Sequence, residues 1–353
     1  MKIKLAILEK DTSYLHKIVS VFNTKYADKF EIYSFTNQDV ALETLEPSKI
    51  DVLLVDDTFE VAGESLPKRC ALAYFVESPD IDSVNDQWAI FKYQKIELIY
   101  KQILSLYAEN ASKVAGLKMD EGSCKLIVFS AASGGVGASC MAAACALNYA
   151  QNQKRVLYLN LEKFGHAELF FKAEGQFTMS DVVFAMKSKK PNLGLKLESF
   201  VRRTSQGVFY FAPSQLALDM LELNTEEIMS LVSELKLTGS YDYIIADCDF
   251  SLEREELKFF RGAHAMVLVC DGSTISNEKT ARAYKALSVL EQNADIPLTS
   301  RVKLVYNRFS NKIGKVMNDL GADSLGGAPV FAHAEVQEVV KQLSGMNLFE
   351  RII

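Results

Sequence analysis

The chain has 353 residues with a formal net charge of −6, and 49% of its residues are hydrophobic and 24% charged. This composition is typical of a globular protein, and the length is sufficient for two or three domains, each with its own core. Residues 1–110 carry 12 basic and 18 acidic side chains, and the remainder carries 27 of each. Neither part is the basic body expected of a protein that coats DNA non-specifically.

Simple patterns exclude further classes of protein. The N-terminus, MKIKLAILEKD, has a charge every few residues and is not a signal peptide, and no apolar run reaches the length of a membrane span. The six cysteines form no CxxC pair, which favours buried free thiols over a metal site. We therefore expect a cytoplasmic protein.

Residues 1–108 alternate short apolar runs with helical patterns, as is typical of a parallel α/β sheet. The predicted strands are Lys4–Leu8, Phe30–Phe35, Val52–Val55, Ala71–Val76 and Ala89–Phe91. Amphipathic helices are predicted at Asp11–Tyr26 and Ile96–Tyr107. Five strands in such a short segment predict a small doubly wound domain. Residues 109–122 lose the apolar periodicity and predict a linker.

The pattern restarts in residues 123–353 with longer units, which predict a second domain. Its predicted strands are Leu126–Phe129, Val156–Leu159, Val208–Ala212, Tyr243–Ala246, Ala265–Val269 and Val302–Tyr306. Helical segments bound several of them, which indicates βα crossovers and a mainly parallel sheet. The fold class predicted for the chain is α/β, with two doubly wound parallel-sheet domains.

A glycine-rich turn, SAASGGVGASC (130–140), follows the first strand of the second domain and opens into an alanine-rich helix. Gly134, Gly135 and Gly137 allow the backbone to turn its N–H groups around an anion, and the helix N-terminus adds further donors. Ser139 stands where a P-loop serine or threonine holds Mg²⁺. The strict P-loop pattern fails because Ala138 replaces its lysine, and a plain turn for strand–helix packing is the alternative reading.

This turn resembles the deviant P-loop, KGGxGK[ST], of the ParA/MinD class of ATPases, with Ser133 in place of the first lysine. RVLYLNLEKFG resembles the second strand and switch of that class, and Asn160 and Glu162 replace its two aspartates. YDYIIADCDF resembles the Walker B strand and places Asp247 in the acidic position. KLVYNRFS and GGAPVFAHAEVQEVVKQ resemble the segments that contact the adenine base. Taken alone, Asp247 could instead cap a turn and Asn307 could be a turn residue.

The resemblance implies a P-loop NTPase fold that binds ATP and Mg²⁺. The implied nucleotide site consists of Ser133, Gly134, Gly135, Val136, Gly137, Ala138, Ser139, Cys140, Asn307, Arg308, Phe331 and Ala332. Ser139 and Asp247 are the implied metal ligands, and Asn160 and Glu162 are the switch positions where catalysis would occur. Because both lysines are missing, we expect binding to survive while hydrolysis becomes weak or is lost.

The first domain resembles a response-regulator receiver domain, which has a flavodoxin-like fold. DVLLVDD places Asp56 in the phosphoacceptor position, and AIFKYQKIELIYKQI places Lys92 as the phosphate-contacting lysine. The metal-binding acids would be Glu9 and Asp11, with Lys10 between them. A lysine within this cluster weakens a metal site, so we expect an atypical receiver that serves as an interaction module, in which Asp56 and Asp57 are simple strand-end acids.

A receiver-like domain ahead of a ParA/MinD-like ATPase resembles the TadZ/CpaE family of pilus-assembly proteins over essentially the whole chain. The family implies a protein that marks the cell pole and recruits Tad/Flp type IVb pilus assembly and secretion proteins. We expect a homodimer that receives these partners through its front domain, and the neutral charge of the ATPase half argues against sequence-specific binding of nucleic acid. Two alternatives remain: an active ATPase that positions DNA or the division apparatus, and a response regulator controlled by phosphorylation. The tail MNLFERII is short and lacks a lysine-rich face, so we expect it to dock on its own domain rather than on a membrane.

Overall fold

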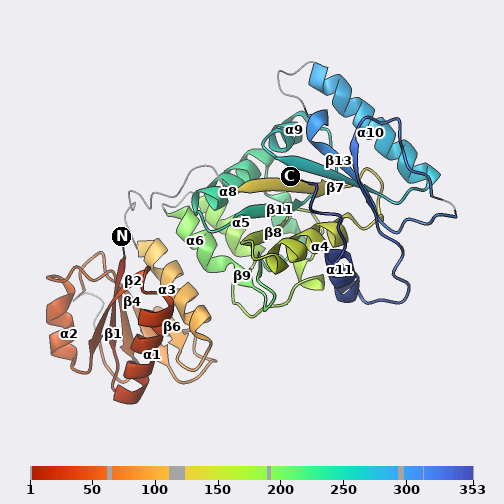
Figure 1. The fold of residues 1–353 in the computed structure, drawn as a ribbon. Coiled ribbons are helices and arrows are strands. Elements are labelled where there is room, and N and C mark those ends of the chain that lie inside the picture. Colours follow the sequence, from red (N-terminus) through yellow and green to blue (C-terminus); the bar gives the residue numbers. More distant parts are fainter. Residues whose placement is uncertain are drawn as a thin grey trace. The chain divides into compact units, whose positions relative to one another are not determined.

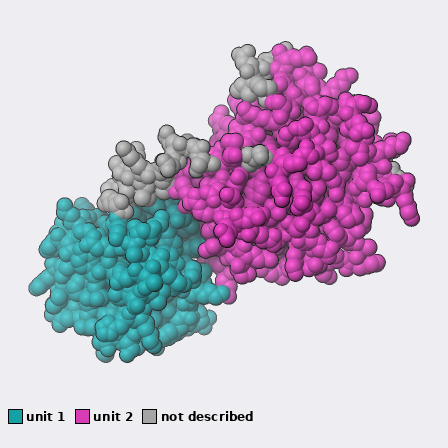
Figure 2. Space-filling view, viewed as in Figure 1, with its two compact units in different colours: residues 1–119, 188–200 teal, residues 120–187, 201–353 magenta. Residues whose placement is uncertain are grey.

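The computed structural model describes residues 2–61, 66–110, 124–188, 192–292, 298–312 and 314–352. Residue contacts divide the chain into two compact units, which Figure 2 shows in different colours. Unit 1 comprises residues 1–119 and 188–200, and unit 2 comprises residues 120–187 and 201–353. In the part of the chain that is described, no helix is long and apolar enough to cross a membrane.

Unit 1 contains a six-stranded sheet in the order β2-β1-β3-β4-β6-β5. The strands are β1 (Ile3–Leu8), β2 (Phe30–Phe35), β3 (Val52–Asp56), β4 (Ala71–Val76), β5 (Ser83–Val84) and β6 (Gln87–Phe91). All neighbours are parallel except the short β5, which pairs with β6 in antiparallel fashion. Without β5, the order is that of the doubly wound flavodoxin-like fold, which confirms the predicted fold class.

Local sequence signals explain where the elements of unit 1 begin and turn. Helix α1 (Thr12–Lys25) begins after Asp11, whose carboxylate accepts hydrogen bonds from the backbone N–H groups of Ser13 and Tyr14. The β5–β6 hairpin turns at Asn85 and Asp86, which both have positive φ, as a type I′ turn requires. Residues 77–86, all of which are described, therefore connect β4 to β6 without a helix.

Two hydrophobic clusters cover the two faces of this sheet. Helices α1 and α3 (Ile96–Asn110) pack on one face, and α2 (Gln38–Leu45) packs on the other (Figure 1). The C-terminal residues of α3 include positions 109 and 110 of the predicted linker, whereas positions 111–122 lie outside the described residues.

A helix from the second half of the chain also belongs to unit 1. Helix α6 (Leu193–Phe200) contacts α3, and Leu195 packs against the cluster formed by α1, α3 and the sheet. Lys196 Nζ lies 2.9 Å from the Glu109 carboxylate at the end of α3. The units therefore differ in one segment from the predicted domain ranges, because residues 188–200 lie within the predicted range 123–353 but group with unit 1.

Unit 2 contains an eight-stranded sheet in the order β14-β13-β12-β7-β11-β8-β10-β9. The strands are β7 (Lys125–Ser130), β8 (Val156–Asn160), β9 (Arg202–Arg203), β10 (Val208–Tyr210), β11 (Tyr243–Asp247), β12 (Ala265–Cys270), β13 (Val302–Tyr306) and β14 (Asp323–Gly327). Its helices are α4 (Ala138–Gln151), α5 (Met179–Ser188), α7 (Ala217–Leu221), α8 (Thr225–Leu237), α9 (Arg254–Arg261), α10 (Thr274–Gln292) and α11 (Val336–Ser344), with 3₁₀ turns at Ala167–Leu169 and Thr299–Arg301. Only β9 is antiparallel to its neighbour.

The C-terminal tail packs against the same core as α4 and α11. Leu348, Phe349 and Ile352 are buried and belong to the hydrophobic cluster around α4. The Tyr149 hydroxyl donates to the Phe349 carbonyl over 3.1 Å. Docking of the tail on its own domain is therefore confirmed, except for Ile353, which lies outside the described residues.

The parallel register of the central strands positions the candidate site. Strand β7 lies between β12 and β11, and β8 lies beside β11, with Asp247 at the end of β11 opposite Asn160 at the end of β8. In open parallel sheets, ligands bind outside the carboxyl ends of the strands. The glycine-rich turn begins at the carboxyl end of β7, on this same edge of the sheet.

Candidate functional site

The glycine-rich turn forms a loop between β7 and α4 whose backbone requires glycine at two positions. Gly135 and Gly137 have φ of +77° and +85°, and Gly137 is the N-cap of α4. Residues with a side chain rarely adopt these backbone angles, so the conformation of the loop favours glycine at both positions. Gly134 differs, because its φ is not in this region and a Cβ there would have no atom within 4 Å. The loop is thus open to solvent beside Gly134 and Gly135.

Two side chains from the end of β13 hold the loop from one side. Asn307 Nδ2 donates to the Val136 carbonyl over 2.8 Å, and Arg308 Nη1 donates to the Gly135 carbonyl over 2.9 Å. A Cβ on Gly137 would lie only 2.4 Å from Asn307 Nδ2, so this glycine also permits a close approach. The structure therefore places both residues against the glycine-rich loop; their expected contact with adenine stays a prediction.

Asp247 is fully buried at the end of β11 and interacts with two residues of β8. The Tyr158 hydroxyl donates to Asp247 Oδ2 over 2.7 Å, and Asn160 Nδ2 lies 3.3 Å from the same oxygen. Asp247 Oδ1 has no hydrogen-bond partner among the described residues. Burial raises the pKa of Asp247 well above its usual range, the charge of the nearby Glu162 adds to this shift, and the hydrogen bond from Tyr158 opposes it.

The predicted switch segment joins this cluster to the loop. Ser139 Oγ donates to Glu162 Oε2 over 3.1 Å, and the Leu161 amide donates to the Asp247 carbonyl over 2.8 Å. Gly165 allows the segment to fold closely over Asn160, because a Cβ at Gly165 would lie 1.9 Å from the Asn160 side-chain oxygen. The structure therefore brings together Ser139, Asn160, Glu162 and Asp247, and their roles in metal binding and catalysis stay predictions.

These residues could supply some of the ligands of a Mg²⁺ ion that also binds a phosphate, but they do not form a complete metal site by themselves. No group of three or more His, Cys, Asp or Glu side chains in the described chain is arranged to hold a metal ion. Mg²⁺ is commonly held by one or two carboxylates together with water and substrate phosphates. A buried carboxylate oxygen without a partner on Asp247, close to the Ser139 hydroxyl, provides a suitable donor set of this kind.

The remaining predicted nucleotide residues lie at the margins of this cluster. Ser133 is buried within the loop, and Cys140 is half-buried in the first turn of α4. Phe331 packs partly buried against the core around α4, whereas Ala332 is exposed. Their contact with a nucleotide stays a prediction.

The predicted receiver residues meet in unit 1 as a closed ionic cluster. Lys92 Nζ lies 3.0 Å from Glu9 Oε2 and also pairs with Asp56 Oδ2, and all three side chains are at most 5% exposed. The other Asp56 oxygen accepts hydrogen bonds from the backbone N–H and the hydroxyl of Thr58. Asp11, the second expected metal-binding acid, caps α1 instead. Both oxygens of the phosphoacceptor position are thus occupied by groups of the chain itself.

The pKa shifts of this cluster follow from burial opposed by the ion pairs. Burial alone would raise the pKa of Asp56, but hydrogen bonds from Lys92 and Thr58 outweigh it and hold this pKa below its usual value. Burial lowers the pKa of Lys92, but the two carboxylates paired with Lys92 raise it, and the net shift is upward. The pKa of Glu9 is raised, because burial outweighs its bonds to the Asp11 amide and Lys92.

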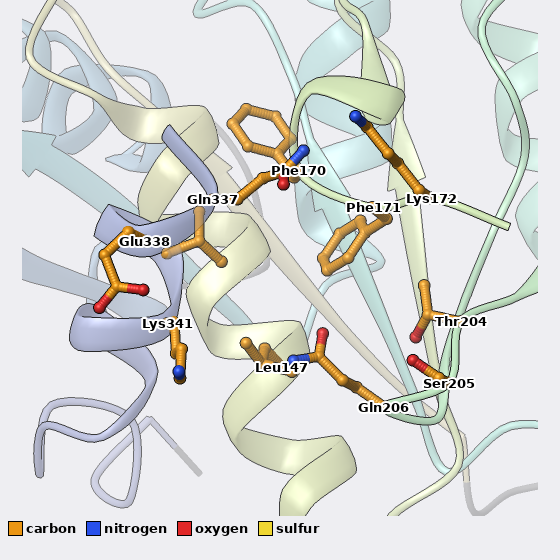
Figure 3. Close-up of a pocket in the computed structure, with 11 residues that line it drawn as sticks. Leu147, Phe170, Phe171, Lys172, Thr204, Ser205, Gln206, Gln337, Glu338 and Lys341 are labelled. Carbon is orange, nitrogen blue, oxygen red and sulfur yellow. The ribbon is translucent and has the colours of Figure 1, made fainter. Parts of the chain in front are cut away.

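A surface cavity of about 280 Å³ in unit 2 lies away from the loop (Figure 3). Leu147 and Phe171 face its interior, and Gln206 and Gln337 approach it from opposite sides. Leu147 lies nine residues after the start of α4, which corresponds to about 13 Å along the helix. The cavity is therefore separate from the glycine-rich loop.

Sequence reasoning missed two residues that complete these sites. Tyr158 lies within a buried apolar strand and looks like an ordinary core aromatic, and only the neighbouring strand reveals its bond to Asp247. Thr58 follows the predicted strand-end acids, where a short polar side chain can bond back to Asp56, and this signal was available in the sequence.

Comparisons with known proteins agree with this two-unit organisation. Residues 1–108 match a family model described as the TadZ-like receiver domain. A ParA family ATPase from Chlorobium tepidum TLS is 20% identical, with a TM-score of 0.51 over 65% of this chain and 97% of that chain. No curated protein matches the chain.

Two further solved structures show weaker likeness. The MinC:MinD cell division complex of Aquifex aeolicus has a TM-score of 0.47 at 16% identity, over 63% of this chain and 96% of that chain. The septum site-determining protein MinD of Pyrococcus horikoshii OT3, solved with Mg-ADP, has a TM-score of 0.48 at 14% identity, over 63% and 94%. Residues 1–108 thus match a TadZ-like receiver domain, and 65% of the chain shares the fold of a ParA family ATPase.

Proposed function

We propose that this protein is an ATP- and Mg²⁺-binding homodimeric scaffold with weak or absent hydrolysis, which localises to the cell pole and recruits Tad/Flp pilus assembly and secretion proteins. One observation carries the nucleotide part of the proposal. A glycine-rich loop opens into α4 beside a buried aspartate, and one carboxylate oxygen of this aspartate has no partner among the described residues.

The loop offers a phosphate group both donors and space. Backbone N–H groups at the start of α4 are directed toward the loop, and the helix dipole favours negative charge there. The positions next to Gly134 and Gly135 are open, so a phosphate meets no side chain on that side. Mg²⁺ would neutralise charge on the phosphates, and we propose that Ser139 and Asp247 hold it, which Oδ1 of Asp247, unpartnered among the described residues, supports.

Binding without rapid hydrolysis follows from the residues that this loop lacks. Residues 130–140 contain no lysine or arginine, since Ser133 and Ala138 replace both lysines of the related ATPases. Each missing donor removes about 3 kcal/mol of transition-state stabilisation, while the backbone donors remain. Asn160 provides an amide bonded to Asp247 where the related switch has a carboxylate.

The cellular part of the proposal is supported by the architecture. A TadZ-like receiver domain precedes the ParA/MinD-like fold, and the front part of the chain is acidic. We infer that the ATPase-like half forms the two-fold dimer and that unit 1 receives pilus-assembly partners.

Each rival function lacks a feature that it requires. A DNA-positioning ATPase needs a basic surface for phosphates, but residues 111–353 carry equal numbers of basic and acidic side chains. A phosphorylation-controlled regulator needs a divalent cation beside an accessible aspartate, but Lys92 and Thr58 already occupy Asp56.

We first predict that the protein binds Mg·ATP and that Asp247→Asn weakens this binding at least about ten-fold, because the amide is a poor magnesium ligand. Calorimetric titration with and without Mg²⁺ measures this effect. Asp249→Asn is the matched control and should bind normally, since its exposed carboxylate accepts from the Lys163 amide and an amide oxygen can accept the same bond. Equal Mg-dependent affinity in wild type and Asp247→Asn would contradict the assignment.

We next predict slow turnover, which rises about 100-fold or more when Ser133→Lys and Ala138→Lys are combined, because two positive donors return to the loop. Release of inorganic phosphate under saturating Mg·ATP measures the rate. An unchanged rate in the double variant would show that the lysines do not limit hydrolysis.

We also predict that Lys92→Met destabilises the protein by about 3–5 kcal/mol at pH 7, because it leaves two buried carboxylates without their cation. Urea unfolding measures the loss, and the exposed Lys17→Met is the control, expected to change stability by less than about 0.5 kcal/mol.

The pH dependence of this loss has a definite sign. In wild type, the lowered pKa of Asp56 gives stability that is present above the unfolded pKa and is lost as the pH falls through the folded pKa. In Lys92→Met, both acids gain stability by taking up protons, so the difference between the proteins should shrink toward pH 4. A constant difference, or no loss at pH 7, would contradict the role of Lys92.

Finally, we predict that a chain lacking unit 1 dimerises but is not recruited to the pole. The deletion removes residues 1–110 and replaces 192–200 with a Gly/Ser linker, since α6 would otherwise lose its partner α3. Light scattering and fluorescence imaging measure both properties. Asp56→Asn serves as the control and should remain polar; a polar truncation, or a dispersed Asp56→Asn protein, would count against this role of unit 1.

A further inference from the structure

Arg308 is a basic side chain in direct contact with a phosphate loop that has none of its own. Its Nη1 donates to the Gly135 carbonyl over 2.9 Å, and its Nε lies 4.0 Å from the position of a Cβ on Gly137. The guanidinium thus lies beside Gly135 and Gly137 of the loop.

The backbone at Arg308 is held in a conformation that arginine seldom adopts. Its φ is +54°, in the left-handed region that favours glycine. The flanking residues are fixed, because the Asn307 amide donates to the Cys270 carbonyl over 2.7 Å and the Phe309 amide donates to the Ala328 carbonyl over 2.9 Å. Strained residues of this kind cluster at ligand sites, where the strain positions a functional side chain.

Most of the hydrogen-bonding capacity of Arg308 is unused by the protein. A guanidinium has five N–H donors, and only the bond to Gly135 is formed with the described residues. The side chain is exposed, so the remaining donors face solvent at the mouth of the loop. The planar guanidinium can donate two parallel hydrogen bonds to the oxygens of a phosphate, whereas a backbone carbonyl offers a single acceptor oxygen.

We propose that Arg308 binds the polyphosphate of the nucleotide and supplies, from the end of β13, positive charge that Ser133 and Ala138 no longer provide. This inference rests on the proposed nucleotide function and changes the expected role of Arg308 from a contact with the adenine base to a contact with phosphate. Because Arg308 approaches from the side of Gly135, it stabilises bound phosphate without occupying the position of the lost lysine at 138.

The test compares ligands that contain only one part of the nucleotide. Arg308→Gln and Arg308→Gly are titrated calorimetrically with Mg·ATP, adenosine and tripolyphosphate. We expect both variants to bind ATP and tripolyphosphate about ten- to hundred-fold more weakly, and adenosine as wild type does. Lys154→Gln is the charge-matched control, because it lies beyond the far end of α4, about 20 Å from its first residue, and should bind all three ligands normally.

Thermal unfolding of the same variants separates a ligand role from a structural one. Glycine relieves the positive φ at position 308, so Arg308→Gly should melt at or above the temperature of wild type. A marked loss of stability in Arg308→Gly would mean that Arg308 only ties down the loop, and it would overturn the proposal. Equal losses for adenosine and ATP, or unchanged ATP affinity, would overturn it also. If wild type binds no ATP at all, the proposed nucleotide function itself fails.

Discussion

The buried carboxylate of Asp247 is the constraint on which the site of unit 2 depends. The end of a central parallel strand places it beneath the glycine-rich loop, and the Tyr158 hydroxyl and the Asn160 amide fix one of its oxygens. A buried charged oxygen without a partner is costly, so this group either keeps its proton or meets a cation. The open loop, the Ser139 hydroxyl and the turn that carries Glu162 all lie around this one unsatisfied group.

Unit 1 also contains buried carboxylates, but a residue of the chain itself neutralises them. There, two buried acids at strand ends share the amino group of Lys92, and Thr58 satisfies the remaining oxygen of Asp56. An acidic cluster that carries its own cation gains little from binding another. The described part of the chain therefore contains one acidic site that is closed by its own residues and one that keeps an unpartnered carboxylate oxygen, and this contrast supports the structural and nucleotide-binding roles that we propose for the two units.

The sequence predicted those parts of the fold that depend on local patterns. Every predicted strand is present within one or two residues at its ends, because each is a run of apolar residues between polar turns. The edge strands β5, β9 and β14 were missed, since two of them have only two residues and β14 contains two glycines. The grouping of α6 with unit 1 was also missed, because its apolar pattern does not reveal which surface it contacts.

The sites were predicted as sets of residues but not as sets of interactions. Spacing after each strand placed Asp56, Asn160 and Asp247 correctly at strand ends. It could not show that Lys92 saturates Asp56, or that Arg308 turns back onto the loop through a positive φ. These features depend on contacts between residues that are tens to hundreds of positions apart, and a single sequence does not show which distant residues are in contact.

Native mass spectrometry of the full-length protein with Mg·ATP tests the central claim most directly, because it counts chains and nucleotides together. The account predicts a complex of two chains with one nucleotide for each chain, which persists over the time in which a hydrolysing relative would release its product. A monomer that retains no nucleotide at any Mg·ATP concentration would contradict it.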